Sequence, residues 1–222
     1  MRHMLFACLF LLVAGPVRAA SLEESMHFVA ASPDFVALGP ADGVAVDLRY
    51  ATANNFVGRN MYGEFRTAYL HRVAAAKLLA AAAGLKRLKP DYRLVIFDAL
   101  RPRSVQQILW DHVKGTDGEN YVANPAGGSV HNYGFAVDLS ILDGTGHELD
   151  MGTPFDDFTE LAKPRLEARF LAEGRLTAAQ VANRHLLRKV MEEAGFTQLP
   201  IEWWHFDAMR KAEIKAKYMI VE

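Results

Sequence analysis

Cysteine is almost absent from this sequence: it occurs once in 222 residues, at Cys8. That residue lies in an N-terminal segment that we expect to be removed, for the reasons given below. The remaining chain then has no disulfide, no thiolate nucleophile and no cysteine ligand for a metal ion. Its stability must come from an apolar core, and any catalytic group must be of another residue type.

An excess of charge of one sign is also missing. The formal net charge is −1 at pH 7, which gives no reason to expect a nucleic-acid or polyphosphate partner. Internal repeats and a Gly-rich phosphate loop are absent from the sequence as well. With 51% apolar residues, a chain of this length can bury a substantial core, so we expect a single globular domain.

Residues 1–19 have the pattern of a secretory signal peptide. A basic start precedes the apolar run Met4–Ala14, which is too short to span a bilayer comfortably. Small residues follow at the usual cleavage offsets. The alternatives are an uncleaved membrane anchor and a lipoprotein acylated at Cys8, which fits poorly because the apolar run continues past that residue. We expect export to the periplasm, a mature domain of residues 20–222, and no stable membrane insertion after cleavage.

Hydrophobic periodicity predicts helices and strands that are interspersed without a regular βαβ rhythm. The predicted strands cover 44–49, 92–99, 135–141 and 201–207, and the predicted helices cover 67–83, 102–113 and 177–194. Glycine-rich and polar stretches at 51–66 and 114–130 are typical of loops. We therefore expect the α+β class, with one mostly antiparallel central sheet flanked by helices.

His131 and Asp138 lie seven residues apart in a segment rich in glycine and apolar residues. Neutral imidazole and carboxylate are both good zinc ligands. On one uninterrupted strand this odd separation would place the two side chains on opposite faces of the sheet. Gly134 offers a turn between them, with His131 in a loop and Asp138 on the following strand. Taken alone, such a pair more often marks a loop histidine and an acid that caps a turn.

Glu202 and His205 enclose two tryptophans and lie three residues apart. Burying an ionisable pair between large apolar rings is costly unless something binds it. Together His131, Asp138 and His205 complete a three-ligand catalytic zinc site that leaves one position for water. Glu202 is then free to act as the general base. Taken alone, a Trp-rich core strand with charges at its edge explains this segment equally well.

Arg101 follows the apolar run of the predicted strand 92–99, in the order Asp98-Ala99-Leu100-Arg101-Pro102. A guanidinium suits an oxyanion or a carboxylate, because it offers paired donors and keeps its charge. Without further context, a salt bridge to a neighbouring acid is the simpler explanation.

Together these segments resemble the D-alanyl-D-alanine dipeptidases of the zinc D,D-peptidase superfamily, peptidase family M15. The shared pattern is Ser-x-His-x-x-Gly-x-Ala-x-Asp over 129–138, Glu-Trp-Trp-His over 202–205, and Arg-Pro at Arg101. It extends to Asp47-Leu48-Arg49-Tyr50-Ala51-Thr52 with Asn55-Phe56, and to Met151-Gly152 with Phe155-Asp156. The resemblance therefore spans nearly the whole mature chain in the same order.

The resemblance implies the D,D-peptidase fold, one Zn²⁺ per chain and the dipeptide D-Ala-D-Ala as substrate. It makes His131, Asp138 and His205 the zinc ligands, Glu202 the catalytic base and Arg101 the group that stabilises the oxyanion. It further implies that Asp156 pairs with the substrate ammonium, in a pocket that Tyr50 and Ser129 line. The other histidines have no matching role, and we expect them to be surface or packing residues: His27, His71, His112, His147 and His185.

The nearest alternative is a D,D- or L,D-carboxypeptidase that acts on longer peptidoglycan peptides. It would keep the zinc site but would need an open cleft and no ammonium-binding acid. A zinc-containing binding protein without activity is less well supported, because binding alone needs no base such as Glu202. Ser129 does not lie in a Gly-x-Ser-x-Gly segment, which argues against a serine hydrolase of that type. The sequence does not indicate the oligomeric state.

Overall fold

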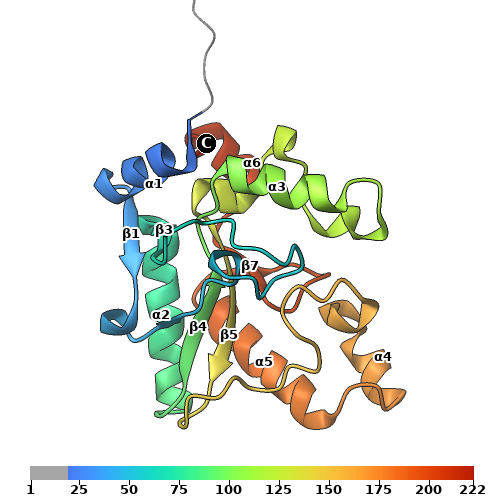
Figure 1. Ribbon diagram of the computed structural model, residues 1–222. Coiled ribbons are helices and arrows are strands. Elements are labelled where there is room, and N and C mark those ends of the chain that lie inside the picture. Colours follow the sequence, from blue (N-terminus) through green and yellow to red (C-terminus); the bar gives the residue numbers. More distant parts are fainter. Residues whose placement is uncertain (1–19) are drawn as a thin grey trace, which may run out of the picture.

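The computed structural model describes residues 20–222 (Figure 1). The predicted signal peptide, residues 1–19, lies outside the described residues. Within residues 20–222, no helix is both long and apolar enough to cross a membrane. The described chain forms one mixed structure of helices and strands, which confirms the predicted α+β class.

A five-stranded sheet lies at the centre, in the order β2-β4-β5-β7-β6. Its strands are β2 (Ala45–Val46), β4 (Arg93–Asp98), β5 (Ala136–Leu142), β6 (Thr197–Gln198) and β7 (His205–Asp207). Only the β2–β4 pair is parallel among these strands, so the sheet is mostly antiparallel as predicted. A separate antiparallel pair joins β1 (Phe35–Leu38) to β3 (Ala68–His71).

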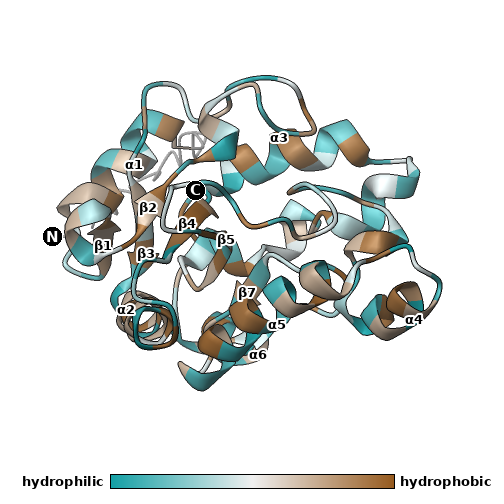
Figure 2. Cartoon of the chain, turned by 90° about the horizontal axis from the view of Figure 1, so that it is seen from below, coloured by the Kyte–Doolittle hydropathy of each residue, from teal (hydrophilic) through white to brown (hydrophobic). Residues whose placement is uncertain are grey.

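Six α-helices surround this sheet in the described part of the chain. They are α1 (Leu22–Ala31), α2 (Arg72–Leu88), α3 (Arg103–Val113), α4 (Glu167–Ala172), α5 (Ala178–Glu193) and α6 (Lys211–Lys217). Helices α2 and α5 contact each other, and Figure 2 shows them on one side of the sheet with α3 on the other. The predicted capping box is present at the start of α5, where Thr177 and Gln180 bond each other's backbone N–H.

Three predicted boundaries are wrong. The segment predicted as the start of a helix at residue 67 is β3, which pairs with β1, and α2 begins only at Arg72 after the N-cap His71. The helix also continues through Gly84, which is buried opposite Val190 of α5. The strand predicted over 201–207 is limited to β7, because Glu202, Trp203 and Trp204 form a turn before it.

Strand register brings distant parts of the sequence together at one place on the sheet. On β5, Asp138 lies opposite Asp98 of β4 and opposite His205 of β7. Its neighbours Val137 and Leu139 point to the other face and are fully buried. The Asp138 side chain therefore points to the opposite face of the sheet from Val137 and Leu139. On that face it lies between Asp98 at the end of β4 and His205 at the start of β7.

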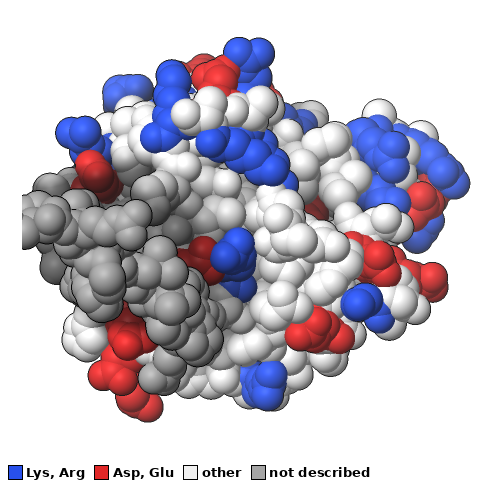
Figure 3. All heavy atoms as spheres, turned by 90° about the horizontal axis from the view of Figure 1, so that it is seen from above, with Lys and Arg blue, Asp and Glu red and all other residues white. Residues whose placement is uncertain are grey.

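Charged side chains of both signs lie on the face of the molecule that Figure 3 shows. On this face, Lys and Arg lie among Asp and Glu around a broad uncharged area.

Candidate metal centre and active site

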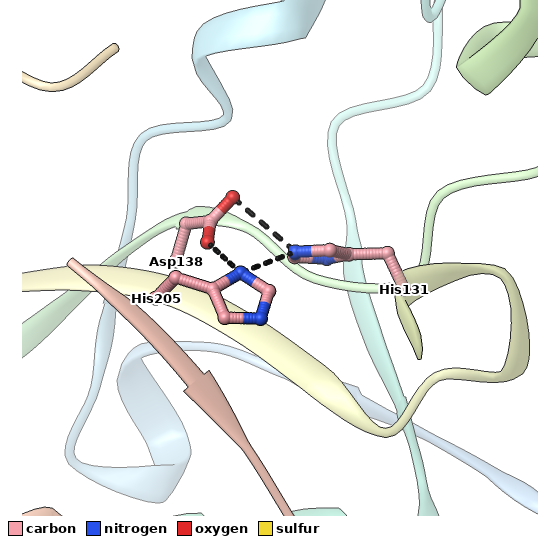
Figure 4. Close-up of side chains that lie close together, drawn as sticks. All are labelled: His131, Asp138 and His205. Atoms are coloured by element: carbon pink, nitrogen blue, oxygen red, sulfur yellow. Dashed lines mark hydrogen bonds and ion pairs between the residues drawn. The ribbon is translucent and has the colours of Figure 1, made fainter. Parts of the chain in front are cut away.

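Three side chains converge at the centre of the sheet (Figure 4): His131, Asp138 and His205. All three are buried, and one ligand atom from each lies within 4.8 Å of the others. His131 Nε2 is 3.2 Å from His205 Nδ1 and 3.4 Å from Asp138 Oδ2. His205 Nδ1 is 3.0 Å from Asp138 Oδ1. The structure thus brings together the three ligands that the sequence predicted.

The turn that the sequence predicted at Gly134 places His131 beside Asp138. His131 lies in a short 3-10 turn, Val130–Tyr133, whose N-cap Ser129 accepts a hydrogen bond from the His131 backbone N–H. The turn ends at Gly134 with φ +71°, in the left-handed region. There, a Cβ atom would come within 2.8 Å of the His71 backbone nitrogen, so only glycine fits without strain.

In each of the two imidazoles, the outer nitrogen, which points away from the other candidate ligands, is engaged in a hydrogen bond. The inner nitrogen, which points towards them, is left available to bind a metal ion. His131 Nδ1 lies 2.7 Å from the Ala99 carbonyl oxygen, so Nδ1 donates and Nε2 has the free lone pair. His205 Nε2 lies 3.0 Å from Asp207 Oδ1, which leaves Nδ1 directed at Asp138. Outer hydrogen bonds of this kind orient metal-ligating histidines. Two imidazole nitrogens and one carboxylate are therefore preset to hold a metal ion.

The charges of these ligands depend on one another in the metal-free protein. Burial raises the pKa of Asp138, but the nearby His131 and His205 outweigh it and hold the pKa well below its usual range. Burial lowers the pKa of His205, but the hydrogen bonds that its ring donates to Asp138 and Asp207 more than reverse this and raise the pKa well above the usual value. The site therefore keeps a negative carboxylate at its centre, which favours a bound cation.

Glu202 lies next to the three ligands without being one of the group. Its Oε2 is 3.9 Å from His205 Nδ1, and the residue is buried in the turn before β7. Burial raises the pKa of Glu202 to about 7. A carboxyl group with such a pKa can take up and release a proton near neutral pH, which general acid–base chemistry requires.

Arg101 is held rigidly beside the same centre. Asp98 accepts from its Nε at 2.8 Å and from its Nη2 at 2.7 Å, while Gln106 accepts from its Nη1 at 2.9 Å. Tyr62 donates to the other oxygen of Asp98 at 2.6 Å. Arg101 Nη2 also donates to Asp138 Oδ2 at 3.4 Å. A guanidinium has five N–H donors, so the second N–H of Nη1 remains.

Asp156 lines the same pocket in an unusual conformation. It is the one non-glycine residue with a positive φ, 61°, among residues 20–222. Its Oδ1 accepts a hydrogen bond from Tyr50 at 3.0 Å, while its Oδ2 is buried without a hydrogen-bond partner. Burial, assisted by the negative Asp138, raises the pKa of Asp156 well above its usual value. A cationic group in the pocket would donate a hydrogen bond to Oδ2 and would also stabilise the ionised form of the carboxyl group.

All eight predicted site residues line one pocket of about 300 Å³: Tyr50, Arg101, Ser129, His131, Asp138, Asp156, Glu202 and His205. None of the other histidines lines it. Sequence reasoning missed the residues that hold the site from behind, namely Tyr62, Asp98, Gln106 and Asp207. Asp98 begins the segment that the sequence analysis singled out for Arg101, and the salt bridge to a neighbouring acid considered there is the one that the structure shows.

Comparisons with known proteins point in one direction. Residues 34–222 match the family model described as D-ala-D-ala dipeptidase. The chain is 34% identical over 167 residues to a D-alanyl-D-alanine dipeptidase of Escherichia coli, covering 75% of this chain and 80% of the relative. The relative of the same name in Enterococcus faecalis is 32% identical over 184 residues, covering 74% and 85%. That in Synechocystis is 30% identical over 182 residues, covering 68% and 71%.

Proposed function

We propose that this chain, which belongs to the D-ala-D-ala dipeptidase family, hydrolyses D-alanyl-D-alanine to two molecules of D-alanine. The observation that carries the proposal is a single small pocket lined by three side chains that can bind a metal ion and by two buried acids, Glu202 and Asp156. The chain covers 71% to 85% of the length of the relatives compared above.

We propose one Zn²⁺ per chain as the metal. Two imidazole nitrogens and one carboxylate oxygen form a donor set that zinc commonly takes in catalytic sites, where the fourth position stays open. His131 Nε2, His205 Nδ1 and an oxygen of Asp138 would hold the ion, and Ala99 and Asp207 fix the two imidazole tautomers. When bound there, zinc would activate water and polarise the scissile carbonyl.

Glu202 is the proposed general base and acid. Its Oε2 takes the proton of the attacking water and then passes it to the nitrogen of the leaving D-alanine, as the C–N bond breaks. The pKa of about 7, raised by burial, suits both transfers. The hydroxyl of the water ends in the new carboxylate, so one water is consumed for each peptide bond.

Arg101 is proposed to stabilise the negative charge that develops on the carbonyl oxygen. Its remaining N–H donor, on Nη1, lies on a guanidinium that Asp98, Gln106 and Asp138 hold in place. Preset donors of this kind stabilise developing charge without having to reorganise during the reaction. Tyr50 packs its ring under the guanidinium, 4.9 Å from the ring centroid to Arg101 Cζ.

Asp156 is proposed to bind the free ammonium of the dipeptide. Its unpaired, buried Oδ2 is an acceptor without a donor, and a substrate ammonium supplies both the donor and the charge. Tyr50 holds the other oxygen, and Ser129 lines the same pocket. The need for an ammonium favours the dipeptidase over a carboxypeptidase, whose longer substrates have no amino group at this place.

The signal-peptide pattern of residues 1–19 supports export, and we propose that the enzyme works in the periplasm. There it would release D-alanine from a product of cell-wall peptidoglycan breakdown. The pattern is sequence evidence alone, and the test is direct: fractionation of cells that express the full chain, with N-terminal sequencing of the soluble protein.

The activity is tested by measuring release of free D-alanine from D-Ala-D-Ala by the purified protein, before and after dialysis against a chelator. L-Ala-L-Ala and N-acetyl-D-Ala-D-Ala serve as matched substrates. Hydrolysis confined to D-Ala-D-Ala, lost with the chelator and regained with Zn²⁺, supports the proposal. Hydrolysis of only a longer, N-blocked peptide would favour the carboxypeptidase instead.

A further inference from the structure

The segment that carries Asp156 has almost no backbone structure of its own. No helix or strand covers residues 150–158, and their only regular backbone feature is a turn at Phe155 and Asp156. Nevertheless Asp156 holds a positive φ of 61° and presents a buried, unpaired oxygen. Both features cost free energy, so something outside the segment must hold it in this conformation.

Helix α5 supplies the missing hydrogen bonds. Arg184 Nε donates to the Met151 carbonyl at 2.6 Å, and Arg184 Nη1 donates to the Leu161 carbonyl at 3.0 Å. These two carbonyls lie on either side of Asp156, five residues away in each direction. One side chain therefore connects both ends of the Asp156 segment, which we define as residues 151–161.

Neighbouring contacts support the same end of this segment. Asn183, also on α5, donates to the Asp150 carbonyl at 2.9 Å. Trp203, which directly follows Glu202, donates from Nε1 to Thr153 Oγ1 at 2.9 Å. The segment is thus tied both to α5 and to the turn that carries the proposed base.

Burial of Arg184 carries a desolvation penalty that its contacts do not explain by stability alone. It is 0% exposed, its Nη2 has no hydrogen-bond partner, and its nearest acid, Glu167, is 3.7 Å from Nη1. An apolar side chain of similar volume would avoid this desolvation. A guanidinium adds a rigid fork of donors that can hold two carbonyls at a fixed separation.

We propose that Arg184 is a positioning residue for substrate recognition, which fixes Asp156 in the conformation that receives the free ammonium of the dipeptide. The inference rests on the proposed function, because it assigns Arg184 an effect only through Asp156. Its action is confined to binding of the amino end, since Arg184 does not line the pocket and does not contact a metal ligand in the described structure.

The test variant is Arg184→Met, and its matched control is Arg188→Met. Arg188 lies one turn further along α5. Its hydrogen-bond partners are both oxygens of Glu167, at 2.8 and 2.9 Å, and Gln198, all outside the Asp156 segment. Both variants remove one buried or half-buried cation from the same helix. Only Arg184→Met releases the segment.

We expect Arg184→Met to raise KM for D-Ala-D-Ala by about 10- to 100-fold, the range for loss of a charge-assisted hydrogen bond. kcat should change less than KM, bound zinc should stay stoichiometric, and Arg188→Met should retain the wild-type KM. Arg184→Lys, which keeps one donor, should recover part of the loss.

The decisive measurement is a double-mutant cycle with Asp156→Asn. If Arg184 acts through Asp156, then kcat/KM of the double variant equals that of Asp156→Asn within twofold, because nothing is left to position. Independent effects that multiply would overturn the inference. An unaltered KM in Arg184→Met would also overturn it.

A second variant keeps the inference testable if Arg184→Met does not fold. Thr153→Val removes the acceptor for Trp203 from a partly exposed position and should raise KM in the same direction, again without further effect in the Asp156→Asn background. Failure of the proposed function itself looks different: the wild-type protein would not cleave D-Ala-D-Ala, or Asp156→Asn would leave its KM unchanged.

Discussion

Tyr50 donates a hydrogen bond to Asp156 Oδ1 at 3.0 Å, while the second oxygen of the same carboxylate is buried without any donor. A buried carboxylate with a hydrogen-bond donor on only one oxygen lowers the stability of the folded protein, but its second oxygen is free to bind a cation. We therefore expect Asp156 to lower the stability of the substrate-free protein and to increase its affinity for the substrate ammonium.

The first prediction concerns the variant Asp156→Asn. We expect the substrate-free protein to become more stable, by about 1 kcal/mol at neutral pH, because an unpaired buried acid is removed. Asparagine also tolerates positive φ. The same variant should lose affinity for D-Ala-D-Ala. Thermal unfolding and steady-state kinetics on one preparation measure both effects, and Asp157→Asn, outside the pocket, is the control.

The stability gain should depend on pH in one direction. Burial raises the pKa of Asp156 in the folded state above its value in the unfolded state. As the pH rises above the usual range of aspartate, the unfolded state loses this proton more readily than the folded state, so the folded protein loses stability. The difference in melting temperature between Asp156→Asn and wild type should thus be small in acid and grow towards neutral pH. A difference that shrinks with rising pH would contradict this assignment.

A second prediction separates the proposed base from the metal site. Glu202→Gln keeps the size of the side chain and removes its ability to take a proton. We expect kcat to fall by about 10²- to 10⁴-fold, with one zinc per chain still bound. Metal analysis and single-turnover assays on the same sample check this. If turnover stayed near the wild-type level, another group would have to be the base.

The sequence predicted those parts of the site that depend on local order. His131, Gly134 and Asp138 share one short segment, and the glycine alone shows that the chain turns between the two ligands. Strands β4 and β5 were recognisable because dense apolar runs of strand length are typical of buried strands. In each case the signal lies within ten residues of sequence.

Other parts depend on pairing between distant segments and could not be predicted. Asp98 becomes part of the site because β4 lies beside β5 in a register that sets it opposite Asp138. Strand β3 has a sequence that also suits the start of a helix, and its pairing with β1 decides the outcome. The positive φ of Asp156 has no sequence signal, and the segment that carries it contacts α5 and Trp203, which are distant in sequence.

A third prediction concerns Asp207, which sequence reasoning missed. Asp207 Oδ1 fixes the outer nitrogen of His205 at 3.0 Å. Asp207→Ala should weaken zinc affinity by about 10- to 100-fold, the usual effect of losing such a partner. Asp207→Asn keeps an acceptor oxygen and should stay close to wild type. Competition with a chromogenic chelator measures both affinities, and equal losses in the two variants would exclude an orienting role.

The last prediction uses two glycines with the same backbone conformation. Gly134 and Gly174 both have φ +71°, but a Cβ atom at Gly134 would lie 2.8 Å from the His71 nitrogen, whereas nothing lies within 4 Å at Gly174. Each alanine substitution carries the backbone strain of positive φ, of order 1 to 3 kcal/mol. Only Gly134→Ala adds a clash with backbone, in the turn that carries His131.

We therefore expect Gly174→Ala to lower the melting temperature without changing zinc affinity. Gly134→Ala should lower the melting temperature further and also weaken zinc binding, because relief of the clash moves His131 relative to Asp138 and His205. Unfolding scans with and without zinc, together with chelator competition, separate the two effects. Equal zinc affinities in the two variants would show that the turn can shift without displacing the ligand.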